Sequence, residues 1–423
     1  MGRELASPDW PALTDDEVGT VLRAYPGVAS SGAAVVWRSP RPMSAAAVVS
    51  AGAMRLFVKR HHVRVRSSAQ LAAEHAFADW LRSHGEPVPR VLRTGDGCSV
   101  PLLGEYRYEV TSMAAGIDLY RDAVSWSPYL RPAHARAAGA ALARLHLAGA
   151  GFGWPARPPV ALMSSCQVVA SSGPAEALER LAASRPGVAG YLAGRPWRDD
   201  LVPALLRAAP AVRALPSQWG HGDWHPSNLT WTPDGAVAGV FDFGLANRTF
   251  AVHDLAIALE RGVVAWLDLP GTGRAAVDFP AAEALLDGYQ SVRPLSPAEA
   301  TALPLVLPVV HVEYALSEIE YFADVTHSPE NAGLAYEYLT GHARWFAGPD
   351  GRELLALLAP PLPTRPPRPS RFPVRPAPAP APGGLARHFT KCPAASYGYA
   401  YVCTRTKGFR ARNIHVRGRC PRT

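Results

Sequence analysis

HGDWHPSNL, at residues 221–229, and FDFG, at residues 241–244, are the stretches that decide the fold of this 423-residue chain. Between them lie two short apolar segments, LTW and AVAGVF, joined by the turn-forming residues TPDG. This pattern predicts a β-hairpin. The hairpin would bring Asp223, Asn228 and Asp242 together, so that two carboxylates and one amide share a site.

These side chains match the needs of phosphoryl transfer, which requires a base for the acceptor hydroxyl, oxygen ligands for magnesium and a cation on the phosphates. Asp223 is expected to orient the hydroxyl and to take its proton. Asn228 and Asp242 are expected to ligate Mg²⁺, which would bridge the phosphate oxygens of ATP. Lys59 would supply the cation. Gly222 gives the backbone the freedom to turn tightly beside these groups.

Upstream of the hairpin, residues 33–59 contain three short Val-rich segments separated by turns, which predict an antiparallel meander that ends at Lys59. A helix should follow, capped by Ser67 and ended by Gly85. Glu74 lies on the apolar stripe of this helix. A carboxylate there is costly unless it is paired, so we expect Glu74 to pair with Lys59. The alternative is that Lys59 and Glu74 are both solvated.

The motifs occur in the order found in the aminoglycoside phosphotransferase and choline kinase superfamily, which the chain resembles from about residue 33 to residue 346. The shared elements are FVK, the EH of the first helix, LARLH, HGDWHPSN, FDFG and HDLA. Homoserine kinase type II and the stress-response Ser/Thr kinases are the most similar branches. The resemblance implies Asp223 as the base, and it implies that Asp254 supports the catalytic loop through His221. We therefore expect Asp223 and His221 to be the catalytic residues.

The fold class implied is α+β: a two-lobed protein-kinase-like fold with a small antiparallel-sheet lobe, a larger helical lobe and ATP between them. We expect the adenine edge to meet the backbone between Thr111 and Met113, and Phe57 to face the adenine. The usual glycine-rich loop over the phosphates is replaced by SPRPMS at residues 39–44. Ser44 and backbone amides are therefore expected to contact the phosphates.

One helix suggests the chemistry of the acceptor. Within residues 309–325, Glu313, Ser317, Glu320 and Asp324 are spaced to share one face, which forms an acidic stripe. We expect Glu313 and Glu320 to hold an amine of a small hydroxyl compound, such as an aminoglycoside, an amino alcohol or a homoserine-like metabolite. A solvated helix face is the alternative. His225 is a further candidate contact of the acceptor.

Three other functions stay open at this level. A protein Ser/Thr kinase would label a protein instead of a metabolite. A nucleotide-binding pseudokinase is disfavoured because none of the five expected site residues, from Lys59 to Asp242, is replaced. A nucleic-acid-binding protein would act through a basic C-terminal segment, for which we expect only weak binding.

The charge is divided unevenly along the chain. Residues 361–423 contain 13 of the 43 Lys and Arg residues and none of the 35 Asp and Glu residues, so residues 1–360 carry 30 basic and 35 acidic side chains. The tail is rich in proline, and we expect it to be disordered and to contribute nothing to catalysis. The expected domains are an N-terminal segment, a nucleotide-binding lobe, a catalytic lobe and this tail, at residues 1–32, 33–112, 113–350 and 361–423.

The five cysteines show no spacing typical of a zinc site, and no uninterrupted apolar run approaches the roughly 18 residues that span a bilayer. The first ten residues also lack an apolar segment. We therefore expect a cytoplasmic protein that has no membrane partner, whose partner is a small-molecule acceptor and whose cofactors are ATP and Mg²⁺.

Overall fold

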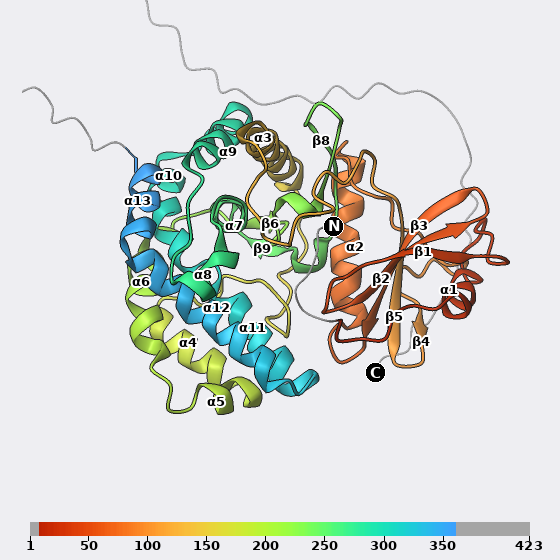
Figure 1. Cartoon of the computed structure of the whole chain (residues 1–423), viewed down its shortest axis with the longest axis horizontal. Helices are drawn as coiled ribbons and strands as arrows, with labels where there is room; N and C mark the ends of the chain where they lie inside the picture. The colour runs from red at the N-terminus through yellow and green to blue at the C-terminus, as the bar shows by residue number, and fades with distance from the viewer. Residues whose placement is uncertain (1–7, 361–423) are drawn as a thin grey trace, which may run out of the picture. The chain divides into compact units, whose positions relative to one another are not determined.

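A five-stranded antiparallel sheet forms the N-terminal lobe of the computed structural model, which describes residues 8–360. Its strand order is β1-β2-β3-β5-β4, and Figure 1 shows the sheet on one side of the described chain with the helical lobe on the other. The strands are β1 (Ala34–Arg38), β2 (Ala45–Ala51), β3 (Met54–His62), β4 (Leu102–Leu103) and β5 (Tyr106–Ser112). The predicted meander is thus present.

One face of β3 packs in the core of the N-terminal lobe, and the other faces the cleft. Leu56 and Val58 are buried in a core that also holds Val18 and Leu22 of helix α1 (Asp15–Leu22), so α1 covers this face of the sheet. Phe57 and Lys59 point to the opposite face, which is turned toward the cleft. The alternation that the sequence predicts for Phe57 and Lys59 is therefore correct.

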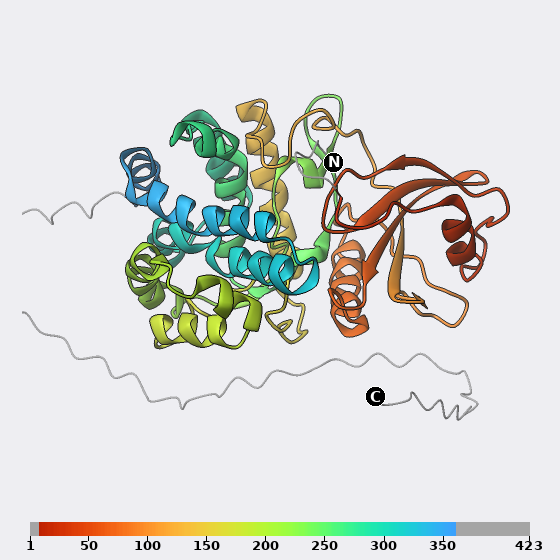
Figure 2. The same cartoon turned by 60° about the horizontal axis from the view of Figure 1, so that its bottom comes forward.

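Helix α2 (Ser68–Ser83) lies between the sheet and the helical lobe in both views (Figures 1 and 2). It begins as predicted, because Ser67 and Gln70 form a reciprocal capping box that satisfies two backbone N–H groups. Phe77 and Leu81 of α2 are completely buried in the same core as the C-terminal lobe. This helix therefore joins the two lobes and carries Glu74 into the cleft.

The C-terminal lobe is helical apart from two small pairs of strands. The pairs are β6 (Gln218–Gly220) with β9 (Asn247–Thr249), and β7 (Leu229–Trp231) with β8 (Val237–Val240). Its helices are α3 (Pro132–Gly149), α4 (Pro174–Ala183), α5 (Pro186–Leu192), α6 (Trp197–Val212), α7 (Ala251–Val263), α8 (Leu269–Thr272), α9 (Phe279–Val292), α10 (Pro297–Val306), α11 (Val312–Glu320), α12 (Pro329–Ala347) and α13 (Pro349–Leu358).

Helices α3 and α9 cross with their backbones in direct contact. A Cβ atom on Gly139 would lie 2.0 Å from the carbonyl oxygen of Leu285, and one on Gly288 would lie 2.0 Å from that of Arg136. No larger residue fits at either position without separating the helices. Helix α3 also carries His146, which is buried behind the catalytic loop.

The predicted hairpin is present as β7 and β8. The HGD stretch lies directly after β6 and before this hairpin, and the FDFG stretch lies directly after β8. At Gly222 the backbone has a φ of +77°, and a Cβ there would lie 2.2 Å from the carbonyl oxygen of Leu245. Glycine is therefore required at this turn of the catalytic loop.

Two expectations from the sequence need correction. Residues 13–25 are not a separate N-terminal segment, since Leu13 and Tyr25 are buried in the core of the sheet lobe. The C-terminal lobe also extends to α13, whose Leu354 and Leu358 are buried in its core. The predicted tail at 361–423 lies outside the described residues.

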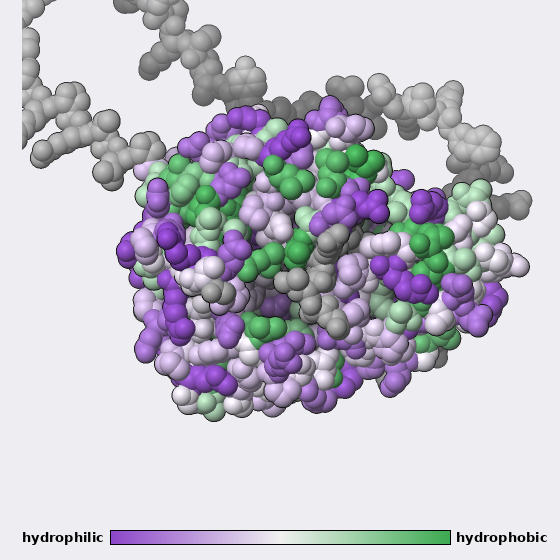
Figure 3. Space-filling view, viewed as in Figure 1, coloured by the Kyte–Doolittle hydropathy of each residue, from purple (hydrophilic) through white to green (hydrophobic). Residues whose placement is uncertain are grey.

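The described chain contains one helical stretch, Pro297–Val325, that is long and apolar enough to cross a membrane. We considered only uninterrupted apolar runs in the sequence and therefore missed this stretch. However, 78% of its apolar window is buried inside the fold, as in the core helix of a globular domain. On the face shown in Figure 3, apolar side chains form small separate groups among hydrophilic ones.

Candidate active site

Three adjoining cavities form a continuous cleft between the lobes. The first is lined by residues 111–114, at the end of β5 and just after it. The second is lined by Lys59 and Asp242, and the third by the catalytic loop. Phe57 and Thr111 line both the first and the second cavity, whereas Lys59 and Asp242 line both the second and the third. The volumes are about 230, 100 and 340 Å³ in that order.

The residues predicted to meet the nucleotide lie along this cleft. Phe57, Thr111 and Met113 line the first cavity, and Ser44 lies at the join between the second and the third. Sequence reasoning missed Arg41, the cation of the turn that replaces a glycine-rich loop. Arg41 lines the second and third cavities and donates to the hydroxyls of Ser125 and Ser227, the latter at 3.2 Å.

The predicted ion pair between Lys59 and Glu74 is wrong, because Lys59 pairs with Asp242 instead. Its Nζ lies 2.9 Å from Asp242 Oδ1. Burial alone would lower the pKa of Lys59, but the surrounding carboxylates, Asp242 foremost, raise it above its ordinary value. Lys59 therefore remains a cation between the two lobes.

Glu74 is paired instead with Arg157, at 3.5 Å, and this is its one ion pair within the described chain. Arg157 also donates to the carbonyl oxygens of Gly244 and Ala246, so it connects α2 to the end of the FDFG stretch and to the residues after it. The sequence could not show this partner, because Arg157 lies 83 residues from Glu74 in an irregular, proline-rich segment.

Asp223 is held on both carboxylate oxygens. Arg261 of α7 donates to Oδ1, and the side-chain amide of Asn228 donates to Oδ2 at 3.0 Å. Burial would raise the pKa of Asp223, but Arg261, and to a lesser degree His225, holds it far below its usual range. Asp223 is thus ionised and fixed in orientation, and it is a weak base before an acceptor binds.

His221 has a positioning role and does not face the cleft. It is completely buried. Its Nε2 donates to the carbonyl oxygen of Phe241 at 3.0 Å, and its Nδ1 accepts from the backbone N–H of Asp223 at 3.2 Å. The expectation that His221 is itself catalytic is therefore wrong: its ring links the HGD loop to the FDFG strand.

Asp254 supports the catalytic loop through backbone atoms and not through the ring of His221. Its carboxylate accepts from the backbone N–H groups of His221 and Gly222, the latter at 2.7 Å, and from His146 Nε2 at 3.1 Å. His146 in turn contacts the hydroxyl of Tyr289 at 2.7 Å. This chain of contacts anchors the loop to α3, α7 and α9.

Replacing Asp254 by asparagine should therefore lower the stability of the folded protein. The amide brings an N–H group toward backbone donors in a completely buried site, so we expect a loss of about 3 kcal/mol in the free energy of unfolding. Urea denaturation measures it. Asp200→Asn is the matched control, because Asp200 pairs with Arg344 in an exposed ion pair and should cost less than about 1 kcal/mol. Equal losses in the two variants would contradict this account.

The donor set fits a divalent cation held against phosphate oxygens. Because the amide nitrogen of Asn228 donates to Asp223, its amide oxygen stays available as a ligand. Asp242 supplies carboxylate oxygens and is about one-third exposed to the cleft. Its backbone has a φ of +63°, an unfavourable conformation for a non-glycine residue that is typical of functional sites. Two hard oxygen donors beside a lysine suit a metal–nucleotide complex.

The acceptor side of the cleft uses a different face of α11 from the one predicted. Glu313 is buried away from the cleft and accepts from the backbone N–H of Val168 at 2.8 Å. Glu320 pairs with Arg185 at 3.2 Å. The acidic stripe therefore packs against the 160–190 segment. Tyr314 and Glu318 line the third cavity instead.

The third cavity surrounds Asp223 with aromatic and charged groups. His225, the predicted acceptor contact, lines this cavity, and its Nδ1 lies 2.9 Å from the hydroxyl of Ser227 and its Nε2 3.6 Å from Asp223. The guanidinium of Arg261 lies over the rings of Trp126 and Tyr314, at 4.8 and 5.0 Å. Burial raises the pKa of Glu318 to about 8, against the opposing influence of Arg261.

Arg261 and Glu318 are the acceptor-side residues that sequence reasoning missed. Each carried a usable signal, because each is a charged residue within a mostly apolar helical stretch, ALERGVVAW and YALSEIEYF. Such a charge is expected to be paired or to face a site.

Comparison with known proteins agrees with this geometry. Residues 44–295 match the model of the phosphotransferase enzyme family. A homoserine kinase of Gluconacetobacter diazotrophicus is 32% identical over 251 residues, which cover 56% of this chain and 66% of that protein. A homoserine kinase of Caulobacter sp. strain K31 is 30% identical over 254 residues, covering 60% and 69%. The chain thus spans about two thirds of the length of these relatives.

Among solved structures, the amicoumacin kinase hAmiN in complex with AMP-PNP and Ca²⁺ has a TM-score of 0.52 at 15% identity, covering 77% of this chain and 92% of that one. This likeness confirms the two-lobed kinase-like fold. With the family model matched from the turn at Ser44 through the catalytic loop to α9, the chain belongs to the phosphotransferase enzyme family.

Proposed function

We propose that this protein transfers the γ-phosphoryl group of ATP, with Mg²⁺, to a hydroxyl of a small molecule that also carries an amine. The observation that supports the transfer is the convergence of Lys59, Asp223, Asn228 and Asp242 in one cleft, with a cavity on each side of them. Because its donor would be ATP, we also propose a cytoplasmic location.

Each residue has a distinct task in this proposal. Lys59 binds the phosphates, while Asn228 and Asp242 hold Mg²⁺. Mg²⁺ held there would offset the charge that develops on the transferred group. Asp223 orients the acceptor hydroxyl. Because Arg261 depresses its pKa, Asp223 takes the proton only late, when the oxygen has begun to bond to phosphorus.

The acceptor chemistry follows from the lining of the third cavity. Glu318 offers a buried carboxyl group, and Trp126 and Tyr314 offer aromatic faces. An ammonium group is the partner that best satisfies both, through an ion pair and cation–π contact. Homoserine, the acceptor named for the relatives, carries such a group. We propose a hydroxylated amine or amino acid as the substrate class.

The experiment is ADP release across a panel of hydroxyl compounds, with the mass of the product as a second readout. We expect amino alcohols, homoserine-like amino acids or aminoglycosides to be phosphorylated, whereas matched hydroxy compounds without an amine should not be. Transfer only to a protein, or only to anionic acceptors, would overturn the proposed substrate class.

The pH dependence of acceptor binding gives a sharper prediction. An ammonium group binds the ionised form of Glu318, whose pKa is about 8. Below pH 8, most of the free enzyme has a protonated Glu318, which must lose its proton before the acceptor binds. KM for the amine-bearing acceptor should fall on the order of 20-fold from pH 6.5 to pH 8.5. Steady-state kinetics at saturating ATP measures it.

Glu318→Gln removes this titration. The variant should show a KM that stays flat over the same pH range and that is about 30-fold above the wild-type value at pH 8.5, while KM for ATP is unchanged. Glu320→Gln is the matched control, because Glu320 lies on the same helix and pairs with Arg185 outside the third cavity. A normal pH profile in Glu318→Gln would refute the role of Glu318.

A further inference from the structure

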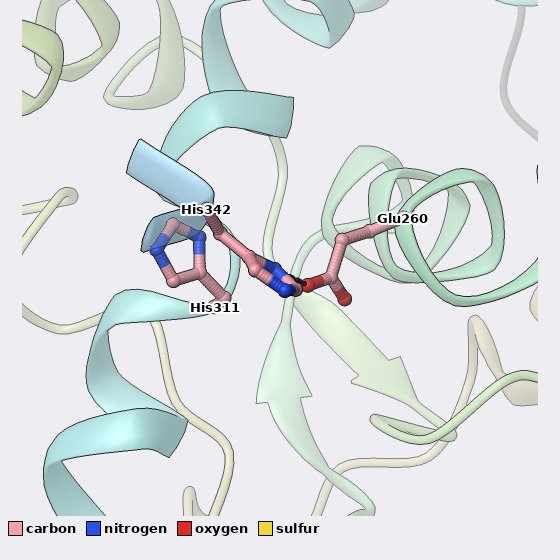
Figure 4. A group of neighbouring side chains, drawn as sticks. All are labelled: Glu260, His311 and His342. Carbon is pink, nitrogen blue, oxygen red and sulfur yellow. Dashed lines mark hydrogen bonds and ion pairs between the residues drawn. The ribbon is translucent and has the colours of Figure 1, made fainter. Parts of the chain in front are cut away.

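A second cluster of ionisable side chains lies behind the third cavity, on the far side of Arg261. Glu260 of α7, His311 in the turn before α11 and His342 of α12 converge from three separate parts of the chain (Figure 4). All three are buried, with exposed fractions of 0%, 1% and 5%. One candidate ligand atom from each lies within 4.8 Å of the other two. The proposed phosphotransfer chemistry uses none of them.

The hydrogen bonds of His311 leave one ring nitrogen free. Its Nε2 contacts the carbonyl oxygen of Leu339 at 3.0 Å, and a carbonyl can only accept, so Nε2 carries the hydrogen. A second hydrogen on Nδ1 would be buried without an acceptor, so Nδ1 holds a lone pair. That nitrogen is buried and has no hydrogen-bond partner within residues 8–360. A histidine whose N–H is fixed by a backbone carbonyl is oriented as metal ligands are.

Glu260 and His342 offer the other two donors. Glu260 Oε1 accepts from His342 Nδ1 at 2.9 Å. Glu260 Oε2 is buried and makes no hydrogen bond in the described chain; Arg261 Nε lies 3.5 Å from it. The ring of His342 stacks on Trp266 with a centroid distance of 3.5 Å, which fixes its plane. Figure 4 shows His342 reaching toward the carboxylate of Glu260.

We infer that Glu260, His311 and His342 bind one divalent transition cation of the zinc type. Two imidazole nitrogens and one carboxylate oxygen are a donor set that zinc accepts, whereas magnesium and calcium prefer oxygen ligands alone. Binding moves the hydrogen of the neutral His342 ring from Nδ1 to Nε2 by exchange with water, so that Nδ1 can bind the cation, and a water completes the coordination. The nearest cation is Arg261, whose charge is offset by Asp223.

The fold provides a path to this site. A cavity of about 880 Å³ is lined by Trp266, Tyr338 and His342. It shares Trp126 and Leu267 with the third cavity of the cleft. A cation held there would link α7, the turn before α11 and α12, next to Arg261.

The test uses the full-length chain after chelator treatment, with Zn²⁺ titrated against a chromophoric chelator. We expect the wild-type protein to hold one more tightly bound Zn²⁺ than His311→Gln, in which affinity for that ion falls at least about 100-fold. The cysteines and histidines of residues 361–423 are the same in both proteins and contribute equally. With Co²⁺, the lost site should lack the thiolate charge-transfer absorption of cysteine ligands.

Two further variants make the result decisive. Glu260→Gln keeps the shape of the side chain and should lose the same ion, so it replaces His311→Gln as the test if that variant does not fold by circular dichroism. His134→Gln is the control, since His134 is a buried histidine whose ring contacts Tyr120 outside the cluster, and it should keep the ion. Equal Zn²⁺ stoichiometry and affinity in wild type, His311→Gln and Glu260→Gln would overturn the inference.

Discussion

Asp223→Asn is expected to lower kcat/KM by at least about 1,000-fold while leaving the affinity for the metal–nucleotide complex within about twofold of the wild-type value. The amide cannot accept the hydroxyl proton, and it loses the ion pair with Arg261, so the acceptor oxygen is no longer oriented. Asp223 lines the third cavity and not the second, which explains why the nucleotide should still bind.

Single-turnover kinetics and nucleotide titration test the two halves of this prediction separately. Asp287→Asn serves as a control for the general effect of removing a carboxylate, because Asp287 forms an exposed ion pair with Arg136 and lines none of the three cavities. Activity of Asp223→Asn within tenfold of the control would remove Asp223 from the mechanism and, with it, the proposed roles of the catalytic loop.

Asp242→Asn should also lower kcat/KM by at least about 1,000-fold, but with a different signature in binding. The variant loses a charged metal ligand and the partner of Lys59, so nucleotide affinity should fall about tenfold when Mg²⁺ is present and change little when it is absent. Isothermal titration with and without Mg²⁺ measures this difference.

Asp234→Asn is a fitting control for this variant, because Asp234 lies in the exposed turn of the same hairpin and should leave both activity and binding intact. If Asp242→Asn weakened nucleotide binding to the same extent with and without Mg²⁺, the role of Asp242 as a metal ligand would be lost, and a role through Lys59 alone would remain.

The sequence allowed the fold to be predicted wherever a local pattern determined the structure. The strands of residues 34–62, the capping of α2 by Ser67 and the hairpin after Asn228 all depend on periodicity, caps and turns within a few residues. The positions of Asp223, Asn228 and Asp242 followed from the hairpin for the same reason.

The ion-pair partners of Glu74 and Asp223 depend on contacts across long stretches of sequence, so the partner predicted for Glu74 was wrong and the partner of Asp223 was missed. Glu74 meets Arg157 and Asp223 meets Arg261, over separations of 83 and 38 residues. Helix α11 is buried nearly all round, so periodicity could not tell that Glu318 lines the cleft whereas Glu313 packs against a loop. A buried helix has no solvated face to orient it.

The contact between α3 and α9 has a consequence for variants that arise far from the cleft. Gly139 and Gly288 let the two backbones touch, and the same helices carry His146 and Tyr289, which lead through Asp254 to the catalytic loop. A bulky residue at either glycine would displace this support while every residue that contacts ligand stays unchanged. In a genetic screen, such alleles should be recovered as temperature-sensitive losses of activity and should regain it on cooling.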